Sequence, residues 1–199
     1  MRASTYSRAC LLLCFALACF AVPGGQAQPY LAAGNAHTCV LVVNGAVKCW
    51  GSGGNGRLGY GDAVTRGDGP GEMGNALPAV DLGTGRTATT LTLNNSFGHV
   101  CARLDNGAVK CWGSGTSGRL GYGDISDRGD GPGEMGDALP AVNLGTGRTA
   151  TAVSAGSSHT CAVPDNGAVK CWGTGSSGQL GYGDTVTRGD GPGEMGDAL

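Results

Sequence analysis

The sequence predicts an all-β protein that is built from three copies of one unit. A cysteine, an Asn-Gly turn and a Cys-Trp-Gly motif recur in the same order, and the first cysteines of the copies are Cys39, Cys101 and Cys161. Forty glycines separate short β-prone runs. No segment has a sustained apolar period of 3.6 residues, which disfavours a helical or leucine-rich solenoid. A repeated unit favours a stacked scaffold over an enzyme with one unique site.

Each copy offers up to four short strands, and an Asn-Gly turn joins the second strand to the third in a hairpin. The strand candidates are residues 149–154, 160–163 and 168–172 of the third copy, with a fourth at 139–144 in the second copy. Four short antiparallel strands are typical of one blade of a β-propeller. We therefore expect three blades of a partial, open propeller. Their predicted bounds are residues 28–90, 91–152 and a truncated 153–199.

Residues 1–27 lie outside the repeats. Arg2 and Arg8 precede an apolar run from Ala9 to Val22, and Pro23-Gly24-Gly25 ends that run. The run is too short for a helix to cross about 30 Å of hydrocarbon. We interpret residues 1–27 as a signal peptide, so that the mature chain is secreted or extracytoplasmic and has no membrane span. An uncleaved N-terminal anchor is the alternative.

The charge of the chain excludes some partners. The formal net charge is −2 and no basic block is present, so neither nucleic acid nor an anionic membrane is an expected partner. The glycines follow no Gly-X-Y period, which excludes collagen.

The hairpin turn predicts which cysteines face each other. Asp105-Asn106-Gly107 suits a three-residue loop, in which a type I turn is followed by a left-handed glycine. Cys101 then lies opposite Cys111 in a non-hydrogen-bonded pair, where side chains approach most closely. In an oxidising compartment such pairs form disulfides, whereas reduced cysteines would pack as small hydrophobic side chains. The expected disulfides are Cys39–Cys49, Cys101–Cys111 and Cys161–Cys171.

Glycine-rich segments in each copy match the G-x-G-x-x-G pattern, but no helix follows them to hold a pyrophosphate. We therefore expect tight loops and no cofactor. The segments are residues 51–56, 113–118 and 173–178.

Acidic side chains recur in a Gly- and Pro-rich stretch of each copy. Loop oxygens suit Ca²⁺, but their spacing is not that of a twelve-residue calcium loop. An arginine precedes one aspartate by two residues, so we expect local Arg–carboxylate contacts and no metal. The residues are Asp62, Arg66, Asp68 and Glu72, then Asp124, Arg128, Asp130 and Glu134, then Asp184, Arg188, Asp190 and Glu194.

Each copy has one histidine and one tryptophan. The histidine precedes a cysteine by two residues, as in some zinc sites, but no second short-spaced pair completes the ligand set. We therefore expect structural histidines and tryptophans that fill the space between blades. No Ser/His/Asp or Cys/His/Asn set is unique, so no catalytic residue is predicted. The residues are His37, His99 and His159, and Trp50, Trp112 and Trp172.

The second copy differs from the others before its histidine. Residues 94–96 read Asn-Asn-Ser, a glycosylation sequon. Asn94 is therefore a possible glycosylation site, meaningful only in a eukaryotic secretory route.

The third copy strongly resembles the repeat of the regulator of chromosome condensation family. The matching residues are His159–Ala162, Asp165–Gly173 and Gly178–Asp184, and the resemblance extends over residues 30–199. It implies a seven-bladed propeller of four-stranded blades. The family includes a nuclear guanine-nucleotide exchange factor and, among secreted bacterial proteins, a β-lactamase inhibitor protein. Gly53, Gly115 and Gly175 stand where asparagine is common, and Arg57 and Arg119 replace the glutamine seen at Gln179.

The matching residues build the scaffold of the family and do not form its functional surfaces. We therefore expect a secreted, non-enzymatic interaction scaffold that binds an unknown protein partner. A regulator of a small GTPase that resembles the exchange factor is the alternative. Three copies cannot close a seven-bladed ring, so we expect a fragment of a longer repeat protein, with further repeats or self-association.

Overall fold

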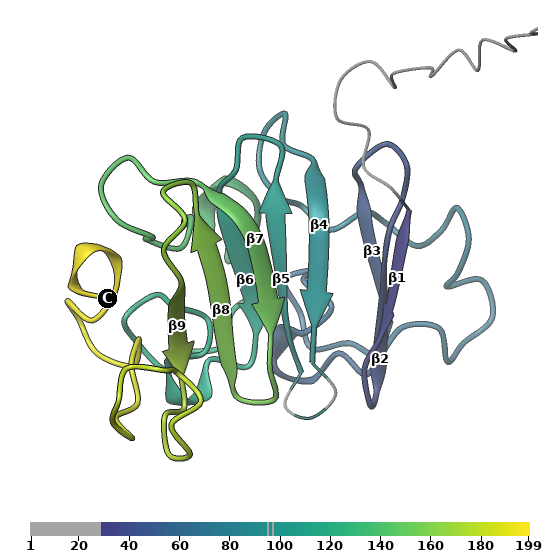
Figure 1. Ribbon diagram of the computed structural model, residues 1–199. Coiled ribbons are helices and arrows are strands. Elements are labelled where there is room, and N and C mark those ends of the chain that lie inside the picture. Colours follow the sequence, from purple (N-terminus) through teal and green to yellow (C-terminus); the bar gives the residue numbers. More distant parts are fainter. Residues whose placement is uncertain (1–28, 95, 97) are drawn as a thin grey trace, which may run out of the picture.

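The computed structural model describes residues 29–94, 96 and 98–199, and these form three stacked antiparallel sheets (Figure 1). Each sheet has three strands in chain order. The strands are β1 (Tyr30–Ala33), β2 (His37–Leu41) and β3 (Val47–Gly51), then β4 (Ala88–Leu93), β5 (His99–Leu104) and β6 (Val109–Gly113), then β7 (Ala150–Ala155), β8 (His159–Pro164) and β9 (Lys170–Gly173). The all-β prediction and the partial, open propeller are confirmed.

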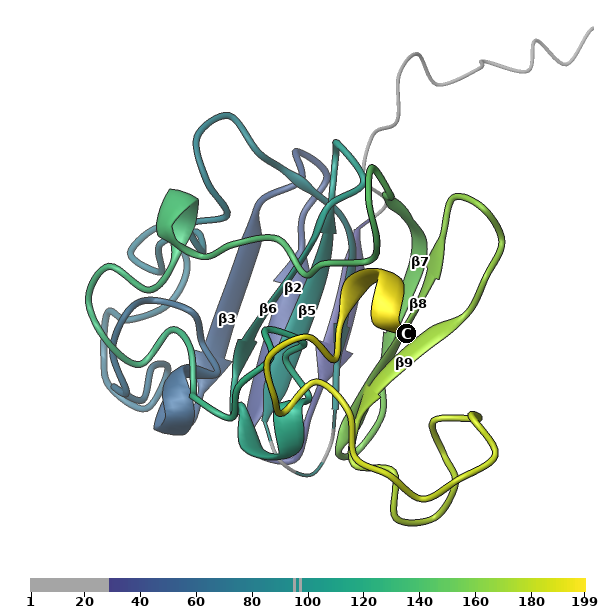
Figure 2. The ribbon, with the colours of Figure 1, turned by 90° about the vertical axis from the view of Figure 1, so that its left-hand side faces the viewer.

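In the described residues, three short 3₁₀ turns lie in the connections between strands and a fourth follows β9. They are η1 (Gly54–Gly56), η2 (Thr116–Gly118), η3 (Gly136–Ala138) and η4 (Gly196–Ala198). Within the described residues, no helix is long and apolar enough to cross a membrane. The long connections run beside β3 and β6, the last strands of the first two sheets (Figure 2).

The hairpin register agrees with the prediction. In each turn an asparagine carboxamide accepts a hydrogen bond from the backbone N–H two residues on, as Asn106 Oδ1 does from Ala108 at 3.1 Å. The following Gly107 takes φ +79°, which only glycine adopts without strain. Because this turn sets the pairing, Cys101 faces Cys111 across β5 and β6. The equivalent cysteines face each other in the other two sheets.

Each facing cysteine pair is a disulfide, and its two Cα atoms are 4.1 Å apart. Both cysteines are fully buried in the first two sheets. Closing a loop of this size stabilises the fold by about 2–3 kcal/mol, because it restricts the unfolded chain. The disulfides therefore reinforce the same hairpins that the Asn-Gly turns begin.

The fourth strand predicted at residues 139–144 does not form. One backbone hydrogen bond joins the segment to the sheet: the N–H of Val142 donates to the carbonyl of Val109 at 2.8 Å. Pro140 has no N–H to donate, so it interrupts any ladder here. Leu139, Val142 and Leu144 are nevertheless buried. The segment thus covers the edge of the sheet through side-chain packing rather than as a strand, and each sheet has three strands instead of four.

Trp112 and Trp172 fill the spaces between the sheets, as predicted, whereas Trp50 of the first sheet is only half-buried. Trp112 of β6 is fully buried in a core that also contains Leu58 and Val80 of the first unit. Gly59, at φ +73°, lies against the indole, where an added Cβ would come within 2.8 Å of Nε1. Trp172 packs in the same way against Gly121. A glycine without a side chain therefore makes room for the indole of the following unit.

The last unit shows how the segment at the sheet edge (residues 139–144 in the second unit) affects the burial of one valine. Val47 and Val109 are fully buried, but the equivalent Val169 is 62% exposed. Val80 and Val142 are bonded through their N–H groups to the carbonyls of Val47 and Val109. The buried state of this valine therefore depends on the segment that crosses the sheet edge.

Replacing Gly107 by alanine should lower the free energy of unfolding more than replacing Gly167. Both substitutions force a side chain to positive φ, which costs about 1 kcal/mol. Only at Gly107 would the new Cβ also meet the next unit, 2.7 Å from Thr149 Cβ, since nothing lies within 4 Å of the position at Gly167. Urea unfolding of both variants measures the difference. Equal losses would show that the turn does not pack against the following unit.

Candidate functional site

A long loop leaves the last strand of each sheet and returns to pair with its end. In the first unit Gly51 donates to the carbonyl of Arg66 at 2.7 Å, and Arg66 N–H donates back at 3.0 Å. The same two-bond bridge joins Gly113 to Arg128 and Gly173 to Arg188. We call residues 62–73, 124–135 and 184–195 the acidic loops. They begin at an aspartate and end at a methionine in every unit.

An arginine clamps each acidic loop onto the strand. The Arg66 guanidinium makes two hydrogen bonds to Asp62, at 2.9 and 2.8 Å, and lies 4.3 Å above the ring of Tyr60. The Tyr60 hydroxyl lies 2.9 Å from the N–H of Cys49, which donates to it, and 3.0 Å from the carbonyl of the same residue. The predicted Arg–carboxylate contacts are therefore confirmed, and they connect the loop to the disulfide-bearing strand.

A glutamate closes each acidic loop. Glu72 Oε2 accepts three backbone hydrogen bonds, from Gly67 at 2.7 Å, Asp68 at 3.1 Å and Gly69 at 3.0 Å. The backbone N–H groups, that of Gly69 first, hold the pKa of Glu72 below its usual value. Glu134 and Glu194 make the same three contacts. These carboxylates organise the turn, and across the described part of the chain no three His, Cys, Asp or Glu side chains gather to hold a metal ion.

The glycine-rich segments form tight loops, as predicted. Gly56 N–H donates to the carbonyl of Gly53 at 3.1 Å within η1. Gly56 also lies so close to the next unit that an added Cβ would fall 2.3 Å from the backbone nitrogen of Asp130. The glycine is therefore required where these two units approach each other closely.

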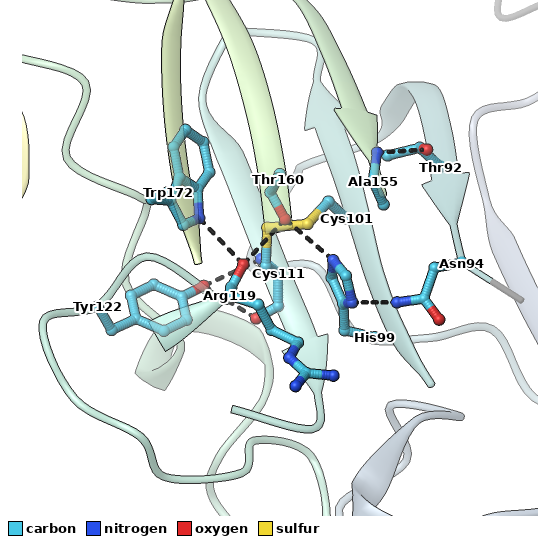
Figure 3. The surroundings of a disulfide bond; sticks show 10 residues. All are labelled: Thr92, Asn94, His99, Cys101, Cys111, Arg119, Tyr122, Ala155, Thr160 and Trp172. Carbon is cyan, nitrogen blue, oxygen red and sulfur yellow. Dashed lines mark hydrogen bonds between the residues drawn. A yellow bond between two sulfur atoms is a disulfide. The ribbon is translucent and has the colours of Figure 1, made fainter. Parts of the chain in front are cut away.

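A buried polar network joins the second and third units (Figure 3). His99 Nε2 donates to Thr160 Oγ1 at 2.9 Å, and that hydroxyl donates to the carbonyl of Arg119 at 2.9 Å. Trp172 Nε1 donates to the same carbonyl at 3.0 Å. The Asn94 amide donates to His99 Nδ1. These roles require one neutral tautomer of His99, with its proton on Nε2.

The first junction lacks this network because Val100 stands where the third unit has Thr160. Within the described residues, His37 Nε2 and Trp112 Nε1 are buried without a hydrogen-bond partner. The sequence contained the signal for this difference, since His-Val-Cys in the second copy replaces the His-Thr-Cys of the others. Thr160 is a residue that the sequence patterns did not single out.

The histidines have structural roles. His99 contacts Asn94 and Thr160, both side chains, rather than the backbone. Burial lowers the pKa of His99 to about 3, and burial followed by the nearby Arg57 charge lowers that of His37 to about 4. Both imidazoles are therefore neutral near pH 7.

Glycosylation of Asn94 stays a prediction. Its side chain is 4% exposed, and Oδ1 accepts hydrogen bonds from the N–H groups of Ser96 at 3.0 Å and Gly98 at 3.1 Å. A glycan on this amide would have to be attached before the chain folds. Residue 95 of the sequon lies outside the described residues.

Two equivalent clefts open beside the acidic loops, one at each junction between units. The first has a volume of about 440 Å³ and is lined by Tyr60, Arg66, Pro78, Pro132 and Met135. The second, of about 560 Å³, is lined by the equivalent residues of the next junction. Each cleft combines apolar walls with an arginine at its rim. Such a combination suits the side chains of a bound partner.

Replacing Thr160 by valine should lower the free energy of unfolding by about 1–3 kcal/mol, because it leaves the buried His99 N–H without an acceptor. Val100→Thr should raise it by about 1 kcal/mol, since the hydroxyl would give His37 Nε2 a partner. Thr38→Val is the matched control, with an expected change within about 0.5 kcal/mol. Denaturant unfolding compares the three variants. A stabilising Thr160→Val would contradict the network.

Acid should destabilise the fold between about pH 6.5 and pH 4. In this range the unfolded histidines bind protons, whereas the folded His99 and His37 do not, because their pKa values are about 3 and about 4. The unfolded state thus binds more protons, and the free energy of unfolding falls by about 1.4 kcal/mol per pH unit for each histidine. Asp184, with a pKa of about 2, adds a loss only at lower pH. Urea midpoints from pH 7 to pH 4.5 measure this slope, and His37→Gln should reduce it by about half. A flat profile would contradict the burial of neutral imidazoles.

Comparison with known families agrees with the repeat seen in the structure. A model described as the Regulator of chromosome condensation (RCC1) repeat matches residues 30–57 and 150–179. A second model with the same description matches residues 106–163.

The match to curated relatives covers only a part of the length of each relative. The Ultraviolet-B receptor UVR8 of Arabidopsis thaliana is 35% identical over 156 residues, which are 78% of this chain and 31% of the receptor. The E3 ubiquitin-protein ligase HERC2 of Homo sapiens is 34% identical over 152 residues, which are 74% of this chain and 3% of the ligase. The chain spans less than a third of either relative.

Solved structures share the fold. Human WBSCR16 matches with a TM-score of 0.62 and 18% identity, over 83% of this chain and 37% of that one. Prp20p of Saccharomyces cerevisiae matches with a TM-score of 0.55 and 21% identity, over 78% and 34%. The repeated motif, the stacked sheets and the matching family models agree, and the chain belongs to the Regulator of chromosome condensation (RCC1) repeat family.

Proposed function

We propose that this protein is a secreted, non-enzymatic scaffold that binds another protein through loops and clefts of its stacked units. The observation that carries the proposal is that some repeated residues are buried and join the units, whereas others form exposed loops and clefts. Buried polar groups such as His99 and Thr160 connect one unit to the next. The acidic loops and the two clefts instead face outward in equivalent positions. A rigid scaffold that presents repeated loops is suited to binding an extended partner.

Relatives support a binding role. One curated relative is named as a receptor, and Prp20p is described as having binding properties to Gsp1p and histones. The ligase relative shares only 3% of its length with this chain, so its name says little about the matched part. Tyr60, His99 and Glu72 have structural partners, which supports a role without catalysis.

The disulfides support export. Six cysteines form three bonds, four of these cysteines are fully buried, and such bonds persist in oxidising compartments. We propose residues 1–27, which lie outside the described residues, as the signal peptide. We also propose units at residues 28–90, 91–152 and 153–199, within a longer repeat array that covers faces such as that of Val169.

Export can be tested in the cells that produce the protein. Tagged full-length chain should be found outside the cytoplasm, with a new N-terminus near residue 28 and cysteines that react with an alkylating reagent only after reduction. Full-length chain in the cytosol with free thiols would contradict export. It would favour the alternative, a guanine-nucleotide exchange factor-like regulator of a small GTPase.

Protein binding can be tested in the same cells by placing a photo-crosslinking residue at one of three exposed positions. These are Leu31 (63% exposed), Val43 (59%) and Ile125 (62%), which sample three different parts of the molecule. A covalent adduct with another protein at one or more positions is expected. Folded, exported chain that gives no adduct at any position would contradict the scaffold role.

A further inference from the structure

Exposed aliphatic side chains recur on the acidic loops. Val64 is 58% exposed, Ile125 is 62% exposed and Val186 is 56% exposed, and they lie at the same or adjacent positions of the three loops. The fold does not need them, because they cover no core. Ile125 belongs to the middle unit, which has a packed neighbour on both sides, so another unit would not bury it. Each acidic loop therefore presents one exposed aliphatic side chain.

Hydrogen bonds hold the backbone of Val64 and Val186 in place within their loops. Val64 N–H donates to Asp62 Oδ1 at 3.0 Å, and Arg66 Nη1 donates to the Val64 carbonyl at 3.2 Å. The backbone of the loop rests on Gly53, where an added Cβ would fall 2.1 Å from the Val64 carbonyl oxygen. Val186 has the same two hydrogen bonds in the third unit. A partner that binds here would therefore order little of the chain, which favours binding.

The loops also concentrate negative charge. Their formal charges are −2, −3 and −2, whereas the whole chain carries only −2. Burial and the neighbouring Glu134 carboxylate raise the pKa of Asp130, and burial and Glu194 raise that of Asp190. Carboxylates are thus crowded together at the surface, and a cation placed beside them would relieve this repulsion.

Each cleft lies between two consecutive acidic loops. The first is lined by Arg66 of the first loop and by Pro132 and Met135 of the second loop. The other is lined by the equivalent residues of the second and third loops. A segment that follows the two clefts would therefore contact all three acidic loops.

We propose that the acidic loops and the two clefts bind an extended basic segment of another protein, in which aliphatic side chains alternate with lysine or arginine. The proposal rests on the proposed scaffold function and names its partner. Charge complementarity selects this occupant. A polyanion would be repelled, and two copies that meet through these loops would bring like charges together.

A synthetic peptide of sequence Lys-Val-Lys-Val-Lys-Val-Lys-Val-Lys tests the proposal by fluorescence anisotropy with the full exported chain. Its β-branched residues favour an extended conformation. We expect saturable binding that weakens as salt is raised from ~0.05 M to ~0.3 M. Replacing the valines of the peptide by serine should weaken binding about tenfold, and replacing its lysines by glutamate should abolish it.

The protein variants locate the site. The triple variant Val64→Ser, Ile125→Ser and Val186→Ser should weaken binding of the peptide about tenfold. Val43→Ser, at a turn and 59% exposed, is the matched control and should leave binding within about twofold. Both should keep the thermal melting temperature of the unmodified chain, because the side chains are exposed and cover no core.

Several outcomes would overturn the proposal. These are the absence of saturable binding, equal weakening by the triple and control variants, and equal binding of the glutamate peptide. Sedimentation that shows a dimer in the unmodified chain and a monomer in the triple variant would mean that a second copy occupies this surface, which also overturns it. Adducts at Val43 or Leu31 but not at Ile125 would leave the scaffold function standing and reject this site.

Discussion

The contact on which the structure depends is the packing of one unit's tryptophan against a glycine of the unit before it. A three-stranded sheet of this size cannot bury both of its faces by itself. Trp112 supplies a large apolar surface, and Gly59 leaves the space for it. The indole is a planar group that fills the gap between two sheets, so the sheets stack at a set distance. The loops, the clefts and the polar network all lie at places that this stacking defines.

The disulfide and the tyrosine beside the acidic loop both contact the same residue of β6. Cys111 is bonded across the hairpin to Cys101, and its backbone N–H donates to the hydroxyl of Tyr122 at 3.0 Å. Burial raises the pKa of Tyr122, so the hydroxyl stays neutral and keeps both its donor and its acceptor role. The loop arginine then lies over the ring of the same tyrosine. A chain of contacts therefore runs from the buried disulfide to the surface loop, and it makes the loop a rigid part of the scaffold.

Differences between copies show which repeated residues carry the junctions. The first and second junctions share the tryptophan and the histidine, but only the second has the threonine that joins them. A tandem array can lose such a hydroxyl because apolar packing still holds the sheets together. The loss leaves buried nitrogen atoms without partners, which weakens one junction relative to the other.

The sequence by itself determined the features that depend on neighbouring residues along the chain. The Asn-Gly turn sets the hairpin register, so Cys101 faces Cys111 without any knowledge of the other units. The sequence likewise predicted local Arg–carboxylate contacts in the loops, but the partner of Arg66 is Asp62, four residues before it, and not Asp68, two residues after it. Only the tertiary structure decided what depends on contact between units. It replaced the expected fourth strand at residues 139–144 by a segment that packs through its side chains, because Pro140 cannot donate to a ladder. It also gave His99 its partners in two different units, and it left Ile125 exposed beside a cleft. Apart from the missing N–H of Pro140, which the sequence itself shows, these outcomes depend on how neighbouring units pack, which no local pattern encodes.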